Sequence, residues 1–428
     1  MTNKAVLDDE TINRSPWAEK KPYDQMHSIC SYLGSFPPGL AKYFIQYFTD
    51  KGQTILDPFS GRGTTILESR LNERRSFGSD LNPIAVILSK AKSFKINKQK
   101  VLKRLKDLEI GYDKNLYYPV ADSVDEKIKL IFHKSTISEL CYLKHQLNPM
   151  KSNVDCFISA VTLGILHGGE RKDGTSLYLS ISMPNTFSMS PDYVRKYVQK
   201  NNLNREYRNT FKSIESKLKT ILFKHISPKT EAKVFLCDAK SMSSNNSVSR
   251  LKNQIDLVLT SPPYLGIVNY EKQNWIRAWF AEGLNNSSGS EVVLDDNLNL
   301  NQWLDFSKKV VIETKAMLKK DGVSVFVIGD VKKSEDTIIP LARDFANMVS
   351  QNKFFKNIWV YSDYFDKVNK TTKIWGDTKG RATAIDRIVI MSDTNPFKNN
   401  QRLAGAQKIS FKEIVSSTKS FMGKTFNT

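Results

Sequence analysis

Short apolar segments that end in a polar side chain constrain the fold of this chain most strongly. Residues 54–57 and 76–80 have the pattern of buried strands ending in Asp57 and Asp80, and a helical pattern at 64–70 lies between them. Strand, helix and strand at this spacing are typical of a βαβ unit, whose two strands are parallel. We therefore expect the chain to fold around a parallel sheet covered by helices.

Five further strand-like segments extend the predicted sheet, at residues 234–238, 256–260, 323–328, 357–361 and 386–391. Helical patterns at 303–319 and 341–351 lie between the later strands. Because helices alternate with strands, we predict an α/β fold built on a seven-stranded, mostly parallel, Rossmann-like sheet with a large helical insert.

The alternation of strands and helices stops between the second and third strands. Residues 96–232 are mostly helical in pattern and rich in lysine, and Gly164, Gly168 and Pro184 are expected in loops. We predict five parts: a mobile tail at 1–20, the first part of the sheet domain at 21–95, a basic helical insert at 96–232, the second part of the sheet domain at 233–392, and a C-terminal tail at 393–428.

The charge of the chain favours a polyanionic partner. The 428 residues include 64 Lys and Arg against 44 Asp and Glu, a formal net charge of +20, which by itself fits nucleic acid, an anionic membrane surface or solvated helix faces. No signal-peptide core and no apolar run of bilayer-spanning length occurs, so we expect a cytoplasmic protein without a membrane partner. The cysteines form no CxxC pair and the histidines show no ligand spacing, so no metal site is expected.

Polar residues at the strand ends predict a ligand pocket, because ligands of open α/β sheets bind outside the carboxyl ends of the strands. Asp57 begins a loop with two glycines, Gly61 and Gly63, that fits neither a dinucleotide fingerprint nor a Walker A loop. Asp57 suits an ammonium group, Asp80 suits ribose hydroxyls, and Asp238 suits the amine of an adenine. S-adenosylmethionine meets these demands; the alternative for Asp80 and Asp238 is a role as turn or cap residues.

A second motif, Thr260-Ser261-Pro262-Pro263-Tyr264, follows the fourth strand. Two prolines remove two N–H donors, so we expect their carbonyl groups and the Ser261 hydroxyl to accept hydrogen bonds from an NH₂ group. We expect Tyr264 to stack on the ring that carries this group. The exocyclic amine of a nucleobase is a poor nucleophile, and acceptors for its protons increase the electron density on nitrogen. The motif therefore favours methylation of such an amine.

Together these segments resemble the amino-methylating DNA methyltransferases over residues 27–83 and 234–392. The loop at 57–65 is similar to that family's donor loop, residues 260–264 to its catalytic motif, and residues 34–41 to its N-terminal donor-binding segment. The resemblance implies S-adenosylmethionine as methyl donor and a catalytic set of Ser261, Pro262, Pro263 and Tyr264. It implies a donor site made of Phe36, Pro37, Asp57, Pro58, Phe59, Gly61, Gly63, Thr64, Asp80 and Asp238.

The resemblance also implies a substrate. Ser-Pro-Pro-Tyr is similar to the tetrapeptide of cytosine-N4 enzymes, although many of these place the catalytic motif before the donor loop. We expect a site-specific cytosine-N4 methyltransferase acting on a flipped-out base of double-stranded DNA, with a cognate restriction endonuclease as possible partner and DNA binding that associates it with the nucleoid. The alternatives are adenine-N6 methylation, RNA amine methylation, and a catalytically inactive nucleic-acid-binding protein.

Two basic stretches are candidates for DNA contact. Residues 90–106 contain eight basic residues and no acidic one, and residues 191–233 combine an excess of basic residues with Tyr193, Tyr197 and Tyr207. We therefore expect the insert to carry target recognition, although single lysines are usually only solvated. Residues 183–191 receive no role, Tyr270, Trp275 and Trp279 either border the base pocket or pack between helices, and residues 379–381 either approach phosphate or form a loop.

Overall fold

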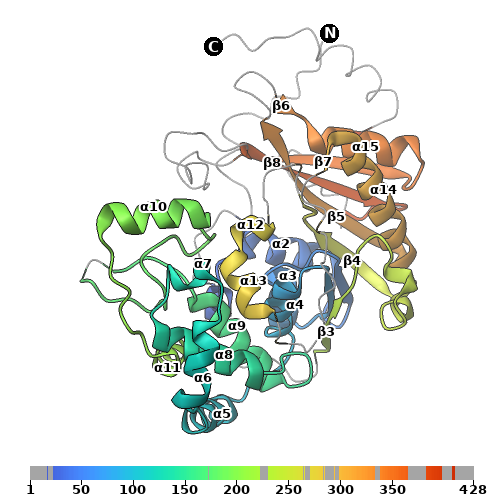
Figure 1. Ribbon diagram of the computed structural model, residues 1–428. Helices are drawn as coiled ribbons and strands as arrows, with labels where there is room; N and C mark the ends of the chain where they lie inside the picture. The colour runs from blue at the N-terminus through green and yellow to red at the C-terminus, as the bar shows by residue number, and fades with distance from the viewer. Residues whose placement is uncertain are drawn as a thin grey trace.

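The computed structural model describes residues 17, 23–171, 173–221, 230–263, 265, 270–282, 284, 294, 298–332, 338–364, 382–397 and 407–409. In Figure 1 these residues form a twisted sheet with flanking helices and a cluster of helices beside one end of it. The strands are β1 (Thr54–Asp57), β2 (Arg75–Asp80), β3 (Ala232–Leu236), β4 (Ile255–Thr260), β5 (Leu318–Lys332), β6 (Ile338–Ile339), β7 (Asn357–Tyr364), β8 (Ala382–Ser392) and β9 (Gln407–Ile409).

Helices flank this sheet, and a further set of helices follows α4 (Pro83–Lys90) in the chain before the third strand begins. Those of the sheet domain are η1 (Gln25–Ser28), α2 (Pro38–Phe48), α3 (Thr64–Leu71), α4 (Pro83–Lys90), η2 (Met242–Ser244), η3 (Ser249–Leu251), α12 (Tyr270–Gln273), α13 (Trp275–Ala281), α14 (Leu300–Met317) and α15 (Leu341–Gln351). Those between β2 and β3 are α5 (Lys98–Ile110), α6 (Lys114–Asp122), α7 (Glu126–Lys129), α8 (Lys134–Gln146), α9 (Asn153–Ile165), α10 (Pro191–Asn201) and α11 (Thr210–Thr220).

The strand order is β3-β2-β1-β4-β5-β8-β7-β9, with β6 paired to β5. The pairs from β3 to β5 are parallel, and β8 runs antiparallel to both β5 and β7. All seven predicted strands are present, which confirms the mostly parallel sheet. The described sheet has two more members, β6 and β9, which contain only two and three residues and are too short to produce a recognisable pattern.

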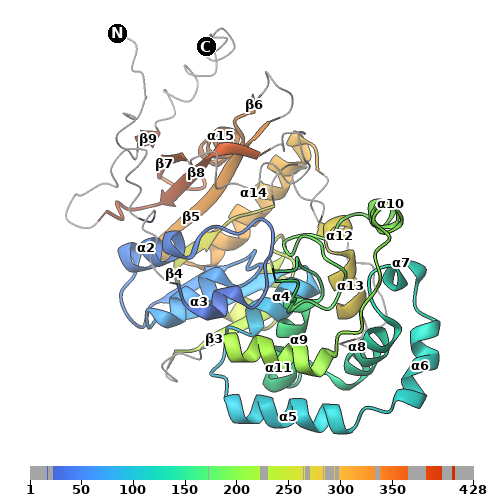
Figure 2. The same cartoon turned by 90° about the vertical axis from the view of Figure 1, so that its left-hand side faces the viewer.

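The central strands β1 and β4 are buried throughout because helices cover both faces of the sheet. Ile55 of β1 packs in one cluster with Leu40 and Phe44 of α2, and its neighbour Leu56 packs in another with Val310 of α14 and Phe345 of α15. Successive side chains of the strand thus point to opposite faces of the sheet and pack against different helices. Figure 2 shows α2 and α14 on the two sides of the sheet.

Trp17 lies in the stretch that was expected to be a mobile tail, yet its side chain is buried. Its ring centroid is 5.4 Å from those of Tyr43 and Phe44 on α2 and 5.3 Å from that of Tyr361 on β7. This indole therefore joins a helix on one face of the sheet to a strand near its edge.

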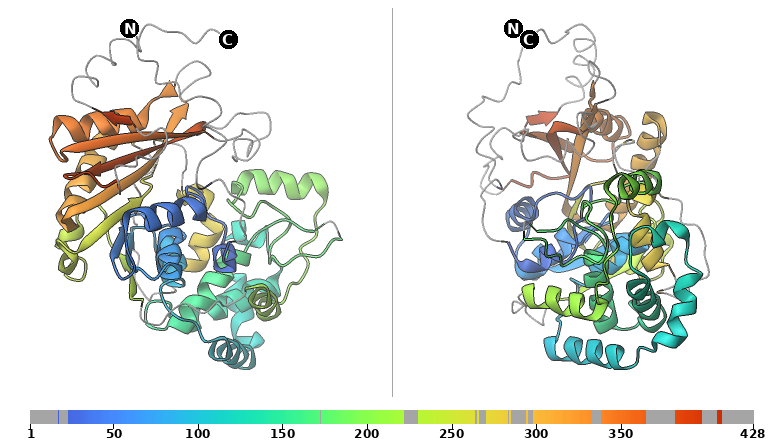
Figure 3. Two further views of the ribbon diagram at one scale, coloured as in Figure 1. Left: turned by 180° about the vertical axis from the view of Figure 1, so that it is seen from behind. Right: turned by 60° about the vertical axis from the view of Figure 1, so that its left-hand side comes forward.

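The helices between β2 and β3 share a hydrophobic core with α4 and α13. Figure 3 shows this cluster from two further sides, away from the edge of the sheet that carries β7 and β8. Within the described residues, no helix combines the length and apolarity needed to cross a bilayer. The structure thus places a large helical body against the β3 side of the sheet.

Gly164 was predicted to mark a loop, and this is wrong. The residue lies inside α9, where the chain passes so close to η1 that a Cβ atom would overlap the carbonyl oxygen of Ile29. A glycine inside a helix can be required because another segment of the chain packs closely against it, and the local sequence does not reveal such a contact.

We predict that Gly164→Ala destabilises the protein by about 1–3 kcal/mol, because the added methyl group must displace backbone rather than a flexible side chain. The measurement is urea unfolding followed by circular dichroism. Gly169→Ala is the matched control, since a Cβ there would only reach ordinary contact with the Met183 carbonyl, at 3.9 Å. Equal stability of the two variants would contradict the close approach of α9 to residue 29.

Candidate active site

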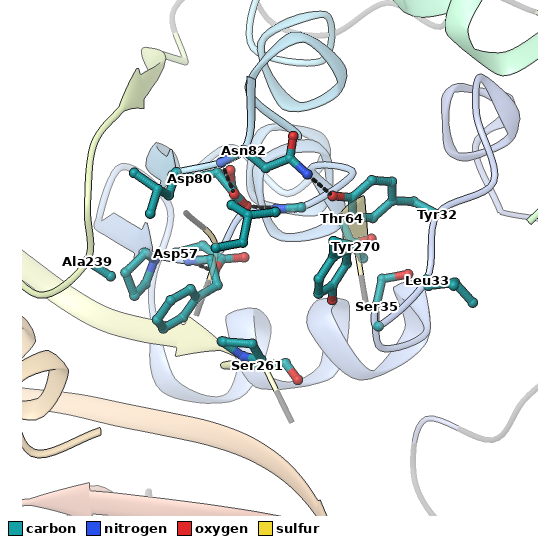
Figure 4. A pocket seen from close by; sticks show the side chains of 18 of the residues that line it. Tyr32, Leu33, Ser35, Asp57, Thr64, Asp80, Asn82, Ala239, Ser261 and Tyr270 are labelled. Carbon is teal, nitrogen blue, oxygen red and sulfur yellow. Dashed lines mark hydrogen bonds between the residues drawn. The ribbon is translucent and has the colours of Figure 1, made fainter. Parts of the chain in front are cut away.

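A pocket of about 830 Å³, counting its part open to solvent, lies at the carboxyl ends of β1, β2 and β4. Figure 4 shows side chains from all three strand ends turned toward it, among them Asp57, Asp80 and Ser261. The structure thus brings together ten of the predicted site residues: Phe36, Asp57, Pro58, Phe59, Gly61, Thr64, Asp80, Asp238, Ser261 and Pro263.

Of the four remaining predicted residues, the structure describes three, and these lie elsewhere. Pro37 is the N-cap of α2, and Pro262 is buried beyond the end of β4; neither lines the pocket. Gly63 is the N-cap of α3 with φ +78°, and a Cβ there would come within 2.8 Å of the Ser89 Cα atom, so this glycine serves close packing. Tyr264 lies outside the described residues, as do residues 379–381.

Asp57 is a fully buried carboxylate at the end of β1. Its Oδ1 accepts hydrogen bonds from the Thr260 hydroxyl (2.7 Å) and from the Phe59 amide (3.1 Å). Burial raises its pKa to about 6, although these hydrogen bonds act in the opposite direction. A cationic group in the pocket would therefore relieve an existing desolvation cost.

Asp80 at the end of β2 is held by two backbone amides. Gly61 donates to Oδ2 and Asn82 to Oδ1, both at 2.9 Å. Burial is the main cause that raises its pKa to about 6, and the nearby charge of Asp57 adds to it. The pocket thus contains two close carboxylates from neighbouring strands.

One wall of the pocket was only partly foreseen from the sequence. The side-chain amide of Asn82 donates to the Tyr32 hydroxyl at 3.0 Å. The Tyr32 ring stacks on the Tyr270 ring, with centroids 5.8 Å apart. Gly34 permits this arrangement, because a Cβ at that position would overlap the Tyr270 hydroxyl. Tyr32 adjoins the donor segment and Asn82 precedes a helix-opening proline, but nothing local in the sequence indicates that they meet.

Helix α4 and the residues just after it fix the donor loop from behind. The Ser89 hydroxyl donates to the Gly61 carbonyl at 2.7 Å and lies 3.0 Å from the Ser60 hydroxyl. The ammonium of Lys92, which is fully buried, donates to the Arg62 carbonyl. Burial lowers the pKa of Lys92 to about 7, and the like charge of Arg62 lowers it further. Three consecutive loop residues are therefore held by one short stretch of chain.

One predicted acceptor is already engaged. The Pro263 carbonyl was expected to be available to a substrate, but it accepts a 2.7 Å hydrogen bond from the indole N–H of Trp303 on α14. This bond fixes the direction of the Pro-Pro segment. A carbonyl oxygen has two lone pairs, so this bond does not exclude a second donor, and the role of Ser261, Pro262 and Pro263 as acceptors for a substrate amine stays a prediction.

Comparison with known families decides the affiliation of this chain. A family model described as DNA methylase, for N6 and N4 enzymes, matches residues 7–91 and 255–414, which is more than half of the chain. The chain belongs to the N6/N4 DNA methylase family. The longest unmatched stretch of this chain, residues 92–254, contains helices α5 to α11 together with β3, η2 and η3.

Three curated relatives are similar to this chain. The type II methyltransferase M.BsoBI of Geobacillus stearothermophilus is 27% identical over 62% of this chain and 55% of its own. M.MvaI of Kocuria varians is 24% identical over 56% and 53%, and M.MjaII of Methanocaldococcus jannaschii is 34% identical over 21% and 17%. The chain therefore spans about half the length, or less, of the curated relatives it matches.

S-adenosylmethionine is the methyl donor that membership of this family implies. The pocket fits it, because two buried carboxylates of raised pKa suit a ligand that carries a sulfonium and an ammonium group. Within the described residues, no cluster of His, Cys, Asp or Glu could hold a metal ion. Which pocket residue contacts which part of the donor remains a prediction.

Donor affinity should depend on pH through Asp57 and Asp80. Their negative charge is present above a pKa of about 6 and is lost as the pH falls through that value, while the donor stays cationic. We expect the Kd for S-adenosylmethionine to be constant above pH 7 and to increase steadily from pH 6 to pH 5, measured by calorimetry. Asp57→Asn should weaken binding and flatten this profile, and a flat wild-type profile would refute the prediction.

Ser89 should act as a positioning residue for the donor loop. Ser89→Ala removes the hydrogen bonds to the Gly61 carbonyl and the Ser60 hydroxyl, so we expect S-adenosylmethionine to bind about three- to tenfold more weakly, measured by calorimetry. Ser93→Ala is the matched control, because that hydroxyl donates only to the Lys90 carbonyl at the end of α4. If both substitutions changed donor affinity equally, the role assigned to Ser89 would be wrong.

Proposed function

We propose that this protein is a site-specific DNA methyltransferase that transfers a methyl group from S-adenosylmethionine to the N4 amine of cytosine in duplex DNA. One observation carries the proposal: the hydroxyl of Thr260, the residue directly before the Ser-Pro-Pro-Tyr segment, donates to Asp57 of the donor loop at 2.7 Å. Strands β1 and β4 are adjacent and parallel, so a donor and an acceptor base would meet at one sheet edge.

The residues of this edge suit an amine nucleophile. When bound, S-adenosylmethionine supplies an electrophilic methyl group. The Ser261 hydroxyl and the Pro262 carbonyl accept hydrogen bonds from the NH₂ group of the base, which increases electron density on its nitrogen and orients the lone pair. Trp303 keeps the Pro-Pro backbone in place through the Pro263 carbonyl. No covalent intermediate with the protein is needed for this direct transfer.

A base paired inside a duplex would not reach Ser261, which is only partly exposed at the end of a buried strand. We therefore propose that the target nucleotide is flipped out of the helix, at a cost of a few kcal/mol. Contacts with the DNA backbone would offset this cost, and the chain as a whole carries a net charge of +20 that suits them.

Cytosine is favoured over adenine by the serine at the first position of the motif, a resemblance to cytosine-N4 enzymes. The matched family covers both N6 and N4 methylation. M.BsoBI and M.MvaI are named type II methyltransferases, which supports a role in the modification half of a restriction–modification pair with a cognate endonuclease. We further propose that residues 96–232 provide target recognition.

The decisive experiment is nucleoside analysis by mass spectrometry of DNA from a methylation-deficient host that expresses the protein. We expect the analysis to detect N4-methylcytosine. Sequencing of the same DNA should place the modified cytosine in one recognition sequence. A host that carries the empty vector is the control. N6-methyladenine as the only product would refute the cytosine assignment, and methylated RNA with unmodified DNA would refute a DNA substrate.

Ser261 and Asp57 should differ in which step they affect. Ser261→Ala should lower the turnover number by about 10²-fold or more, because it removes an acceptor at the reacting amine, and should leave the Kd for S-adenosylmethionine within twofold. Asp57→Ala should instead increase that Kd. Single-turnover methylation and calorimetry separate the two effects, and equal losses of donor affinity would contradict this division.

A further inference from the structure

Residues 183–190, which the sequence left without a role, bind the two helices that follow the catalytic motif. The Ser188 amide donates to the Gln273 carbonyl (2.6 Å), the Trp275 indole donates to the Met189 carbonyl (2.8 Å), and the Arg277 guanidinium donates to the Asn185 carbonyl (2.7 Å). The Arg277 side chain is fully buried. This segment, which we name the 183–190 strap, is therefore tied by its backbone to α12 and α13.

The strap connects a pocket wall to helix α10. Ser190 is the N-cap of α10, and its hydroxyl accepts a hydrogen bond from the Tyr193 amide at 3.3 Å. At the other end, α12 begins with Tyr270, which lines the donor pocket and stacks on Tyr32. The 183–190 strap thus joins the start of α10 to the pocket wall that contains Tyr270, through backbone hydrogen bonds with α12 and α13.

The outer face of α10 has the chemistry of a nucleic-acid contact. Tyr193 is 53% exposed and stacks on Tyr197, with ring centroids 6.2 Å apart and an interplanar angle of 12°. Arg195, Lys196 and Lys200 are exposed beside them, while Val194 anchors the helix in the core. Exposed cations bind phosphate and tyrosine hydroxyls donate to phosphate oxygens, so this face fits a DNA backbone.

The basic side chains at residues 90–106, the other candidate for DNA contact, have more partners within the protein. Lys92 is buried, Lys103 pairs with Asp107, Arg104 with Asp155 and Lys106 with Glu109. In Figures 1 and 2, α5 lies at the end of the insert opposite to α10, whereas α10 lies toward α12. Five of the eight cations at residues 90–106 are therefore buried or have a partner within the protein, whereas Lys95, Lys98 and Lys100 are exposed.

We propose that the exposed face of α10 binds the backbone of duplex DNA and that the 183–190 strap holds this contact at a fixed place relative to the base pocket. The proposal rests on the DNA substrate proposed above and adds where the duplex is held. It commits to duplex DNA because the face combines three cations with one acid, Asp192, which is already paired with Arg195 at 3.1 Å.

The first test compares two double variants that each lose two positive charges. One carries Lys196→Gln and Lys200→Gln on α10, and the other carries Lys98→Gln and Lys100→Gln on α5. All four lysines are exposed. Affinity for a duplex that the wild type methylates is measured at several salt concentrations. We expect the α10 variant to bind more weakly and to lose about two units of the slope of log K against log salt, since each phosphate contact contributes about one. The α5 variant should keep the wild-type slope.

Calorimetry with S-adenosylmethionine should give the wild-type Kd for both variants, which shows that they are folded. An α10 variant that binds the duplex like the wild type, or an α5 variant that loses as much, would overturn the inference while the proposed function stands. A wild type that methylates no DNA would overturn the proposed function itself. The two failures are therefore distinguishable.

The second test addresses the strap. Trp275→Phe keeps an aromatic ring but removes the indole donor to the Met189 carbonyl. We expect duplex affinity within about twofold of the wild type and a clearly lower turnover number at saturating donor and DNA, because the duplex is held but its base is misplaced. Unchanged turnover would refute the coupling between α10 and the pocket.

Discussion

The parallel pairing of β1 with β4 is the constraint on which the rest of the site depends. It sets the carboxyl ends of two strands side by side and allows the hydroxyl of Thr260 to reach the carboxylate of Asp57 across more than two hundred residues of chain. The donor loop leaves from one strand and the Ser-Pro-Pro segment from the other. Reactants bound by either one are thereby brought to a common place, which is the main contribution a protein can make to a direct transfer.

The same edge carries an electrostatic cost. Asp57 and Asp80 are buried near each other, and their raised pKa values show that the charged forms are disfavoured in the free protein. Backbone amides from Phe59, Gly61 and Asn82 keep both carboxylates oriented in spite of this cost. The two buried carboxylates thus favour a cationic ligand, and Ser89 and Lys92 hold the loop by hydrogen bonds to the Gly61 and Arg62 carbonyls.

The sequence predicted the sheet well because its strands are buried on both faces, and continuous apolar runs ending at polar residues are visible without any structure. It also indicated most of the pocket, since strand ends in a parallel sheet meet at one edge. It could not reveal contacts between distant segments: the Tyr32 and Tyr270 stack, the close approach at Gly164, or the Trp303 bond to Pro263. Charge counting likewise could not distinguish Lys92, which is buried, from the exposed lysines that follow it.

The attachment of the helical cluster has a further consequence for the evolution of such a protein. The cluster is inserted between β2 and β3, at one edge of the sheet, yet its core also includes α13, which follows β4 in the chain. The unit that must stay mutually complementary is therefore discontinuous, residues 98–221 together with 270–281. Exchange of the insert alone would remove the Leu163 and Asn185 carbonyl groups that the buried Arg277 side chain now binds, so the insert and α13 should change together.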